Sequence, residues 1–228
     1  MEHNCNIECE DDEQRRPIHC ASRNGHADVV RLLIDRNCNI ECEDNEQRRP
    51  IHYACEKGHA DVVRLLIDRN CNIECENNEQ RRPIHYACEK GHADVVRLLI
   101  DRNCNIECED NEQMRPIHYA SRNGHADVVR LLIDRNCNIE CEDDEQRRPI
   151  HCASMNGHAD VVRLLIDRNC NIACEDEWQK RPIHWASRNG HAEIIQLLML
   201  NKCRIECKTK GAKEMLNPEE FPVAFAMG

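Results

Sequence analysis

The feature that most constrains this chain is a 33-residue repeat, written six times without insertion or deletion. The segment RRPIHYACEKGHADVV occurs at 48–63 and again, unchanged, at 81–96. Self-similarity at such a period indicates a repeat array, in which each unit buries its apolar face only against its neighbours. Two residue types recur at the same interval, a proline (Pro17, Pro50, Pro83, Pro116, Pro149 and Pro182) and a glycine (Gly25, Gly58, Gly91, Gly124, Gly157 and Gly190).

One repeat predicts two short helices and a polar turn. Pro50 suits the first position of a helix, because its missing N–H is not needed there. We expect a helix over 50–57 that ends at Gly58, since glycine adopts the left-handed cap conformation without steric cost. A second helix over 59–67 carries too many apolar residues for a single stripe, and Asn70 ends it. Helices this short are marginal alone, so the repeats must stack and share a core.

The order of residues within each repeat resembles the ankyrin repeat. The motifs Pro-Ile-His-Tyr-Ala, Gly-His and Val-Val-x-Leu-Leu-Ile follow one another at the ankyrin spacing, and the resemblance covers residues 4–207. It implies an all-α ankyrin-repeat solenoid of paired antiparallel helices with β-hairpin fingers, curved around a concave groove. It also implies a protein-binding module without catalysis.

The resemblance divides the chain into a repeat array and a C-terminal segment. Residues 209–228 are expected to form a capping segment and tail, with a short helix over 210–216 and the remainder folded back over the last repeat. We expect the array over 1–208, with repeats at about 11–43, 44–76, 77–109, 110–142, 143–175 and 176–208.

Each repeat departs from the ankyrin consensus at the residue before proline. Arg49 and its equivalents replace the usual threonine, which removes about 1 kcal/mol of helix capping per repeat. The replacement also predicts that His52 and its equivalents lack their usual hydroxyl partner. Cysteines such as Cys38 and Cys42 stand where the family has small packed residues, so we interpret them as small buried hydrophobic residues.

The repeats differ from one another at a few registers, which by resemblance face the groove and the fingers. The residue after the repeated histidine is tyrosine in three consecutive repeats, and Tyr and Trp are enriched at binding hot spots. We therefore predict a partner-binding face, with neutral drift at exposed positions as the alternative. Its residues are Arg15, Arg23, Asn45, Arg48, Tyr53, Glu56, Lys57, Arg81, Tyr86, Glu89, Lys90, Tyr119, Arg122, Asn123, Trp178, Trp185 and Arg188.

Doubled arginines such as Arg48 and Arg49 form a basic row near the lip of the predicted groove. Acidic residues such as Glu43, Asp44 and Glu46 lie close to them in the sequence. Two interpretations follow. Either the two sets pair with each other within the array, or the arginine forks capture an acidic or phosphorylated segment of a partner.

The composition limits the classes of partner and chemistry. The net charge of −11 argues against a nucleic acid partner, whose phosphates need clustered Lys and Arg. No apolar run reaches the roughly 20 residues of a membrane span, and the N-terminus carries no secretion signal. We therefore expect no membrane partner and a cytoplasmic or nuclear protein with reduced thiols. No phosphate-binding loop, nucleophile elbow or HExxH motif occurs, so we expect no enzyme activity and no cofactor.

Two other functions remain open at this point. Pairs such as Cys38 and Cys42 could bind a metal, although zinc sites usually need a second pair of ligands nearby. Val29, Val30 and Leu33 of the first repeat match interior copies, so its outer face could meet a partner or a second copy of the chain. Uncapped repeat arrays can stack through such faces. We predict a non-enzymatic protein–protein interaction scaffold, with homo-oligomerisation through the N-terminal face as the main alternative.

Overall fold

The computed structural model describes residues 6–209, and within this range the chain forms twelve helices and no strand. The all-α prediction is therefore confirmed. The helices follow one another in pairs, one pair per repeat. Their bounds are α1 Pro17–Arg23, α2 Ala27–Asp35, α3 Pro50–Lys57, α4 Ala60–Asp68, α5 Pro83–Lys90, α6 Ala93–Asp101, α7 Pro116–Arg122, α8 Ala126–Asp134, α9 Pro149–Asn156, α10 Ala159–Asp167, α11 Pro182–Arg188 and α12 Ala192–Thr209.

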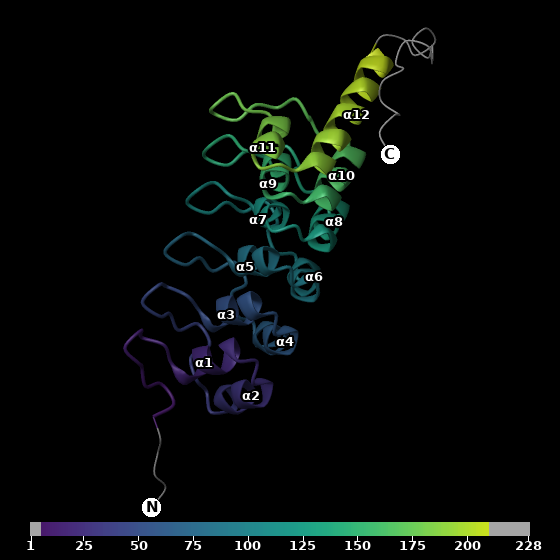
Figure 1. Cartoon of the computed structure of the whole chain (residues 1–228). Helices are drawn as coiled ribbons and strands as arrows, with labels where there is room; N and C mark the ends of the chain where they lie inside the picture. The colour runs from purple at the N-terminus through teal and green to yellow at the C-terminus, as the bar shows by residue number, and fades with distance from the viewer. Residues whose placement is uncertain (1–5, 210–228) are drawn as a thin grey trace, which may run out of the picture.

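The helices lie in two layers that run the length of an elongated array (Figure 1). Odd-numbered helices contact one another in order and form one layer, and even-numbered helices form the other. The loops that precede α3, α5, α7, α9 and α11 project beyond the odd-numbered layer as fingers. We call the surface formed by the fingers and the odd-numbered helices the finger face.

Each finger is a turn and not the β-hairpin that the resemblance implied. In the second repeat, the N–H of Asp44 donates to the carbonyl oxygen of Arg48 at 3.1 Å, and Gln47 is left-handed (φ +60°) at the tip. Successive fingers share one backbone hydrogen bond, such as that from the N–H of Asn45 to the carbonyl oxygen of Glu13 at 3.1 Å. A strand needs a ladder of such bonds, which is why none forms in residues 6–209.

Gly58, at the end of α3, is required by its backbone conformation and by its neighbour. Its φ is +75°, in the left-handed region that favours glycine. A Cβ atom here would lie 2.5 Å from Nδ1 of His92 in the next repeat. That imidazole stays against the glycine because its Nε2 donates to the carbonyl oxygen of Glu56 at 3.0 Å. The predicted end of the first helix at this glycine is confirmed.

A second imidazole joins each repeat to the next from inside the array. His52 is fully buried, and its Nδ1 accepts the N–H of Arg49 at 2.9 Å. Its Nε2 donates to the carbonyl oxygen of Cys75 at 3.2 Å. The equivalent nitrogens of His19 and His118 also reach carbonyl oxygens of the following repeat, those of Arg48 at 3.1 Å and Arg147 at 3.2 Å. Arg49 provides no side-chain cap to α3, as predicted. As predicted, Arg49 supplies no hydroxyl to His52, and backbone N–H and carbonyl groups take the place of that partner.

Aliphatic side chains and cysteines fill the core between repeats. Val62, Val63 and Leu66 of α4 are fully buried. Burial raises the pKa of the Cys42 thiol to about 12, so this thiol stays protonated at neutral pH. Thirteen of the described free cysteines are buried and only Cys9 and Cys20 are exposed, which confirms their interpretation as small hydrophobic residues. Within residues 6–209, no group of three or more His, Cys, Asp or Glu is arranged to hold a metal ion.

The last repeat departs from the others at its second helix. α12 spans 18 residues, whereas α4 spans nine. Asn70 follows α4 with a left-handed φ of +60°. In the last repeat Lys202 holds the register of Asn70, and lysine suits a helix interior. The turn that the sequence predicted here is therefore replaced by continued helix. Neither α12 nor any other helix of the described part is long and apolar enough to cross a membrane. The expected helix over 210–216 and the docked tail lie outside the described residues.

We predict that acid destabilises the array before its carboxylates titrate. Burial lowers the pKa of His52 to about 3, so the folded state disfavours the protonated imidazole. In the unfolded chain the same group binds a proton near pH 6.5. The stability that it contributes is complete above pH 6.5 and is lost as the pH falls toward the folded pKa. Burial also lowers the pKa of the equivalent imidazoles of His19, His85, His118 and His151.

Thermal unfolding followed by circular dichroism should therefore show a Tm at pH 5 that lies on the order of 10 °C below that at pH 7.5. Carboxylates contribute little to this window, because they bind protons mainly below about pH 4.5. An unchanged Tm between the two pH values would contradict the role given to the buried imidazoles.

Candidate partner-binding site

Side chains at the variable registers of repeats two to four lie together on the finger face. They form a stack of alternating tyrosine rings and guanidinium groups. The guanidinium of Arg48 lies 4.1 Å from the centre of the Tyr53 ring and 4.7 Å from that of Tyr86. The guanidinium of Arg81 lies 4.2 Å from the Tyr86 ring and 4.5 Å from the Tyr119 ring. Each arginine thus connects two repeats through cation–π contacts.

Carboxylates accept hydrogen bonds from both the tyrosines and the arginines of the stack. The hydroxyl of Tyr53 donates to Asp44 of the finger, and the guanidinium of Arg48 donates to Glu56 of α3. Burial alone would raise the pKa of Glu56, but hydrogen bonds from Lys57 and Arg48 lower it to about 2, so the ion pairs persist at neutral pH. Equivalent contacts in the next two repeats are Arg81 to Glu89, Lys90 to Glu89 and Tyr119 to Asp110.

The three tyrosines are not the open contact residues that the sequence suggested. Tyr53 and Tyr86 are 6% exposed and Tyr119 is 8% exposed, because guanidinium groups and the adjacent repeats cover them. Burial raises the pKa of each phenol, so the hydroxyls stay protonated at neutral pH. The tyrosines therefore stabilise the array itself.

The arginines directly before the repeated prolines, such as Arg49, form ion pairs within the array. Arg49 donates to Glu41 and, at 2.8 Å, to Glu43. Glu41 also accepts the N–H of Asn72 in the next repeat at 2.7 Å, so the network connects neighbouring repeats. Of the two interpretations of the doubled arginines, mutual pairing is the arrangement found. Partly exposed pairs of this kind contribute little each.

At the C-terminal end of the finger face, the two tryptophans of the chain meet edge to face. The ring centres of Trp178 and Trp185 lie 6.3 Å apart, and the amine of Lys180 lies 4.4 Å from the centre of the Trp185 ring. The guanidinium of Arg188 lies 5.6 Å from the same ring. Trp185 is buried, whereas Trp178 is 47% exposed and is the aromatic side chain of the face that is most open to a partner.

The other predicted residues divide into paired and unpaired side chains. Arg15 pairs with Asp11 at 3.0 Å, and Asn45 is exposed at its fingertip. Arg23 is exposed at the end of α1 and lines a hollow of about 230 Å³ beside Arg15. Arg122 is exposed at the end of α7. Among the described residues, neither Arg23 nor Arg122 has a carboxylate within salt-bridge distance.

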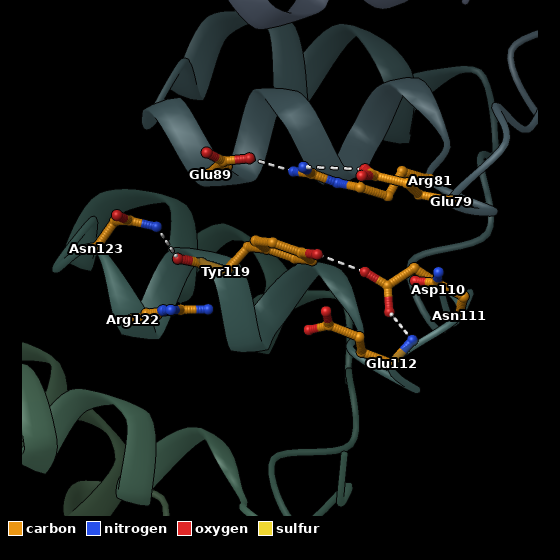
Figure 2. A pocket seen from close by; sticks show the side chains of 9 residues that line it. All are labelled: Glu79, Arg81, Glu89, Asp110, Asn111, Glu112, Tyr119, Arg122 and Asn123. Atoms are coloured by element: carbon orange, nitrogen blue, oxygen red, sulfur yellow. Dashed lines mark hydrogen bonds and ion pairs between the residues drawn. The ribbon is translucent and has the colours of Figure 1, made fainter. Parts of the chain in front are cut away.

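A hollow of about 410 Å³ opens on the finger face between the third and fourth repeats (Figure 2). Arg122 and Asn123 at the end of α7 form one side, and Asp110, Asn111 and Glu112 of the fourth finger form the other. Figure 2 shows that Arg122 and Glu112 approach it from opposite sides. The remaining lining residues are Glu79, Arg81, Glu89 and Tyr119.

Sequence reasoning found one side of this hollow and missed the other. It named Arg122 and Asn123, which vary between repeats, but not Asp110 or Glu112, which resemble the acidic residues of other fingers. No single residue marks them in the sequence, because acidic residues recur in most of the fingers. Met114, which stands at a register where every other repeat has Arg or Lys, lines a separate hollow of about 60 Å³ with Arg122 and Arg147.

Comparisons with known proteins agree with this architecture. A family model described as ankyrin repeats in three copies matches residues 1–77, 69–143 and 136–210. The chain belongs to the ankyrin-repeat family. Among solved structures, the human ASB11 ankyrin repeat domain is similar, at 25% identity and a TM-score of 0.78, over 82% of this chain and 84% of that chain. No curated protein matches the chain. Ankyrin repeats are in general protein–protein interaction modules.

We predict that Tyr86→Ala destabilises this ankyrin array by about 3 kcal/mol, because it removes a buried ring that contacts two guanidinium groups. Arg122→Ala is the matched control on the same face, and it should change the free energy of unfolding by less than about 0.5 kcal/mol. Urea unfolding followed by circular dichroism measures both. Equal, small effects of the two substitutions would show that the stack does not stabilise the array.

Proposed function

We propose that the finger face binds a segment of a partner protein or peptide, and that the protein is a non-enzymatic scaffold. The observation that carries the proposal is the contrast between the two helices of each repeat. The second helix is identical in five of the six repeats. Near the end of the first helix, by contrast, one register varies between repeats and holds Arg23, Glu56, Glu89, Arg122, Met155 and Arg188.

Such a surface keeps its framework constant while the side chains that it offers to a partner vary along the array. The hollow beside Arg122 supports the proposal, because a concave polar site on an otherwise regular face gives a partner a defined position. Free cysteines in the described part fit a cytoplasmic or nuclear location, which we also propose.

An acidic or phosphorylated partner segment would find few available arginines on this face. Arg48, Arg49 and their equivalents in repeats two and three are already paired with glutamates. Arg23, Arg122 and Arg188 have no carboxylate partner among the described residues. We propose that acidic groups of a partner bind at these three positions and not along a continuous row.

Affinity capture from cell extract tests the proposal. The finger-face variant carries Arg23→Ala, Arg122→Ala and Arg188→Ala. The control carries Arg64→Ala, Arg97→Ala and Arg130→Ala, which are exposed on even-numbered helices and change the net charge equally. We expect wild type and control to retain a partner that the finger-face variant loses by about tenfold or more. Equal retention by all three proteins would place the interface elsewhere and refute the proposal.

A second function, self-association, is favoured by apolar side chains on the outer face of the first repeat. Val29 is 45% exposed and Leu32 is 57% exposed, whereas Val62, which is equivalent to Val29, is fully buried against the preceding repeat. We propose that this face associates with a second copy of the chain. The physical reason is that the same side chains already form repeat-to-repeat contacts inside the array.

We predict that wild type forms dimers as its concentration rises into the micromolar range and that Leu32→Glu abolishes them. A buried unpaired carboxylate at the contact would cost more than the association contributes. Sedimentation velocity over a hundredfold concentration range measures the effect, with Arg31→Glu as a control for charge alone. A monomer at every concentration would rule out this second function.

A further inference from the structure

Neighbouring repeats are joined by the same contact of a histidine with a glycine at each of the five junctions of the array. At the first junction, the imidazole of His59 lies so close to Gly25 of the preceding repeat that a Cβ atom there would come within 2.5 Å of its Nδ1. Its Nε2 donates to the carbonyl oxygen of Arg23 at 3.0 Å. The same contact recurs at four further glycines, Gly58, Gly91, Gly124 and Gly157. It is therefore a property of the junction between repeats and not of one pair of residues.

The last repeat presents one half of this junction with nothing against it. Gly190 has the same left-handed conformation (φ +77°), but no atom of the described chain beyond its own neighbours lies within 4 Å of the place of a Cβ atom. Ser187 is exposed, whereas the side chains at its register in the five earlier repeats are 0% exposed. Those side chains are Ser22, Cys55, Cys88, Ser121 and Ser154. Met199 is 58% exposed, whereas Ile100 at the same register is 5% exposed.

The imidazole of the last repeat is open at the same end. His19, in the first repeat, is buried and donates through Nε2 to the carbonyl oxygen of Arg48 in the second repeat at 3.1 Å. His184 holds the same register and accepts the N–H of Arg181 at 2.8 Å, but it is exposed. Within residues 6–201 its Nε2 has no acceptor. We call the surface formed by His184, Ser187, Gly190 and Met199 the C-terminal face.

The first repeat presents the other half of the junction. His26 holds the register of His59 and is exposed, because no described residue occupies the place of a preceding glycine. The carbonyl oxygen of Arg15 accepts the N–H of Asp11 at 3.0 Å, as that of Arg48 accepts the N–H of Asp44, but in residues 6–209 no imidazole reaches it. Val29 and Leu32, which are 45% and 57% exposed, complete this surface. We call His26, Val29, Leu32 and the carbonyl group of Arg15 the N-terminal face.

We propose that the N-terminal face of one copy binds the C-terminal face of a second copy, so that copies associate head to tail and the repeat array continues across the contact. The proposal rests on the self-association proposed above, and it names the surface that the first repeat meets. His26 of one copy lies against Gly190 of the other, and His184 of that copy donates to the carbonyl oxygen of Arg15. Both contacts already occur between repeats within one chain.

Two N-terminal faces do not complement each other in this way. Each carries the imidazole of His26, and neither carries a glycine at the register of Gly190 to receive it. A head-to-tail contact instead brings together both halves of the junction. Such a contact is heterologous, because it joins two different surfaces, and every copy keeps one free face. Association should therefore continue beyond dimers as the concentration rises.

The last helix leaves this contact open on the side of the odd-numbered helices. The continued part of α12 extends from the even-numbered layer, and no described element lies beyond α11 in the odd-numbered layer (Figure 1). One contact of the inner junctions is missing, since Leu200 stands at the register where Asp68 pairs with Arg102 at 3.0 Å. Exposed ion pairs of this kind contribute little, so the imidazole and apolar contacts determine the association.

Two variants of the full chain, each blocked on one face, test the proposal. Leu32→Glu places a carboxylate on the N-terminal face, and Ser187→Glu places one on the C-terminal face. In sedimentation velocity we expect each variant alone to remain monomeric at concentrations where wild type associates, because the contact would bury an unpaired charge. An equimolar mixture of the two should form a dimer and nothing larger, because the mixture holds one free face of each kind.

Two further variants separate the face from net charge and test the imidazole. Gln196→Glu adds the same charge as Ser187→Glu at the register of Arg64, which stays exposed between neighbouring repeats and so lies outside the junction. It should leave the association constant unchanged within about twofold. His26→Ala should weaken association about threefold to tenfold, because one hydrogen bond is lost. All the substituted side chains are exposed in the single chain, so the variants should fold, as circular dichroism would check.

Dimers of Ser187→Glu alone, with the affinity of wild type, would overturn the head-to-tail contact and leave self-association through two N-terminal faces. A mixture of the two blocked variants that stays monomeric would overturn it too. Association that occurs only after removal of residues 210–228 would show that the chain's own C-terminal segment occupies the C-terminal face, which would overturn the proposal for the intact chain. The proposed self-association fails separately, if wild type is a monomer at every concentration with and without residues 210–228.

Discussion

The array depends on a buried imidazole that must stay neutral in each of the first five repeats. His19 and His118 each accept an N–H from their own repeat and donate to a carbonyl oxygen of the next, so one ring ties two units together. His52 holds the equivalent position and donates to the carbonyl oxygen of Cys75. Its fully buried position allows this only without charge, because burial lowers its pKa. Short helices that are marginal alone acquire their order from such contacts and from the shared apolar core. These contacts also set the regular spacing of the fingers and odd-numbered helices on the finger face.

The finger face carries a second set of side-chain contacts, and these contacts differ between repeats. Arg48 and Arg81 lie between successive tyrosine rings and pair with glutamates, so the charges of both arginines are balanced within the array. Repeat four breaks the series at Met114, and the acidic finger beside it is left without its cation. The break leaves the packing of the core intact, because methionine is buried there.

The local parts of this fold could be predicted from the sequence, and the contacts between repeats could not. Pro50 and Gly58 mark the ends of α3 because both act through their own backbone conformation. The tyrosines were predicted to be open contact residues because their register is visible in the sequence. The sequence does not show the path of the fingers, and the arginines that cover the rings come from those fingers. The acidic side of the hollow was missed for the same reason. Its lining comes from two successive repeats, so it depends on contacts that no single repeat shows in the sequence.

The most direct test of the central claim, that a partner binds on the finger face, is hydrogen–deuterium exchange of the free and partner-bound protein. Proteolytic peptides that contain Met114 are unique within the repeats and can be followed individually. The account predicts slower exchange on binding in the finger around residues 110–114 and at the end of α7, with the even-numbered helices unchanged. Protection confined to the even-numbered helices or to the outer face of the first repeat, with no change around Met114, would contradict it.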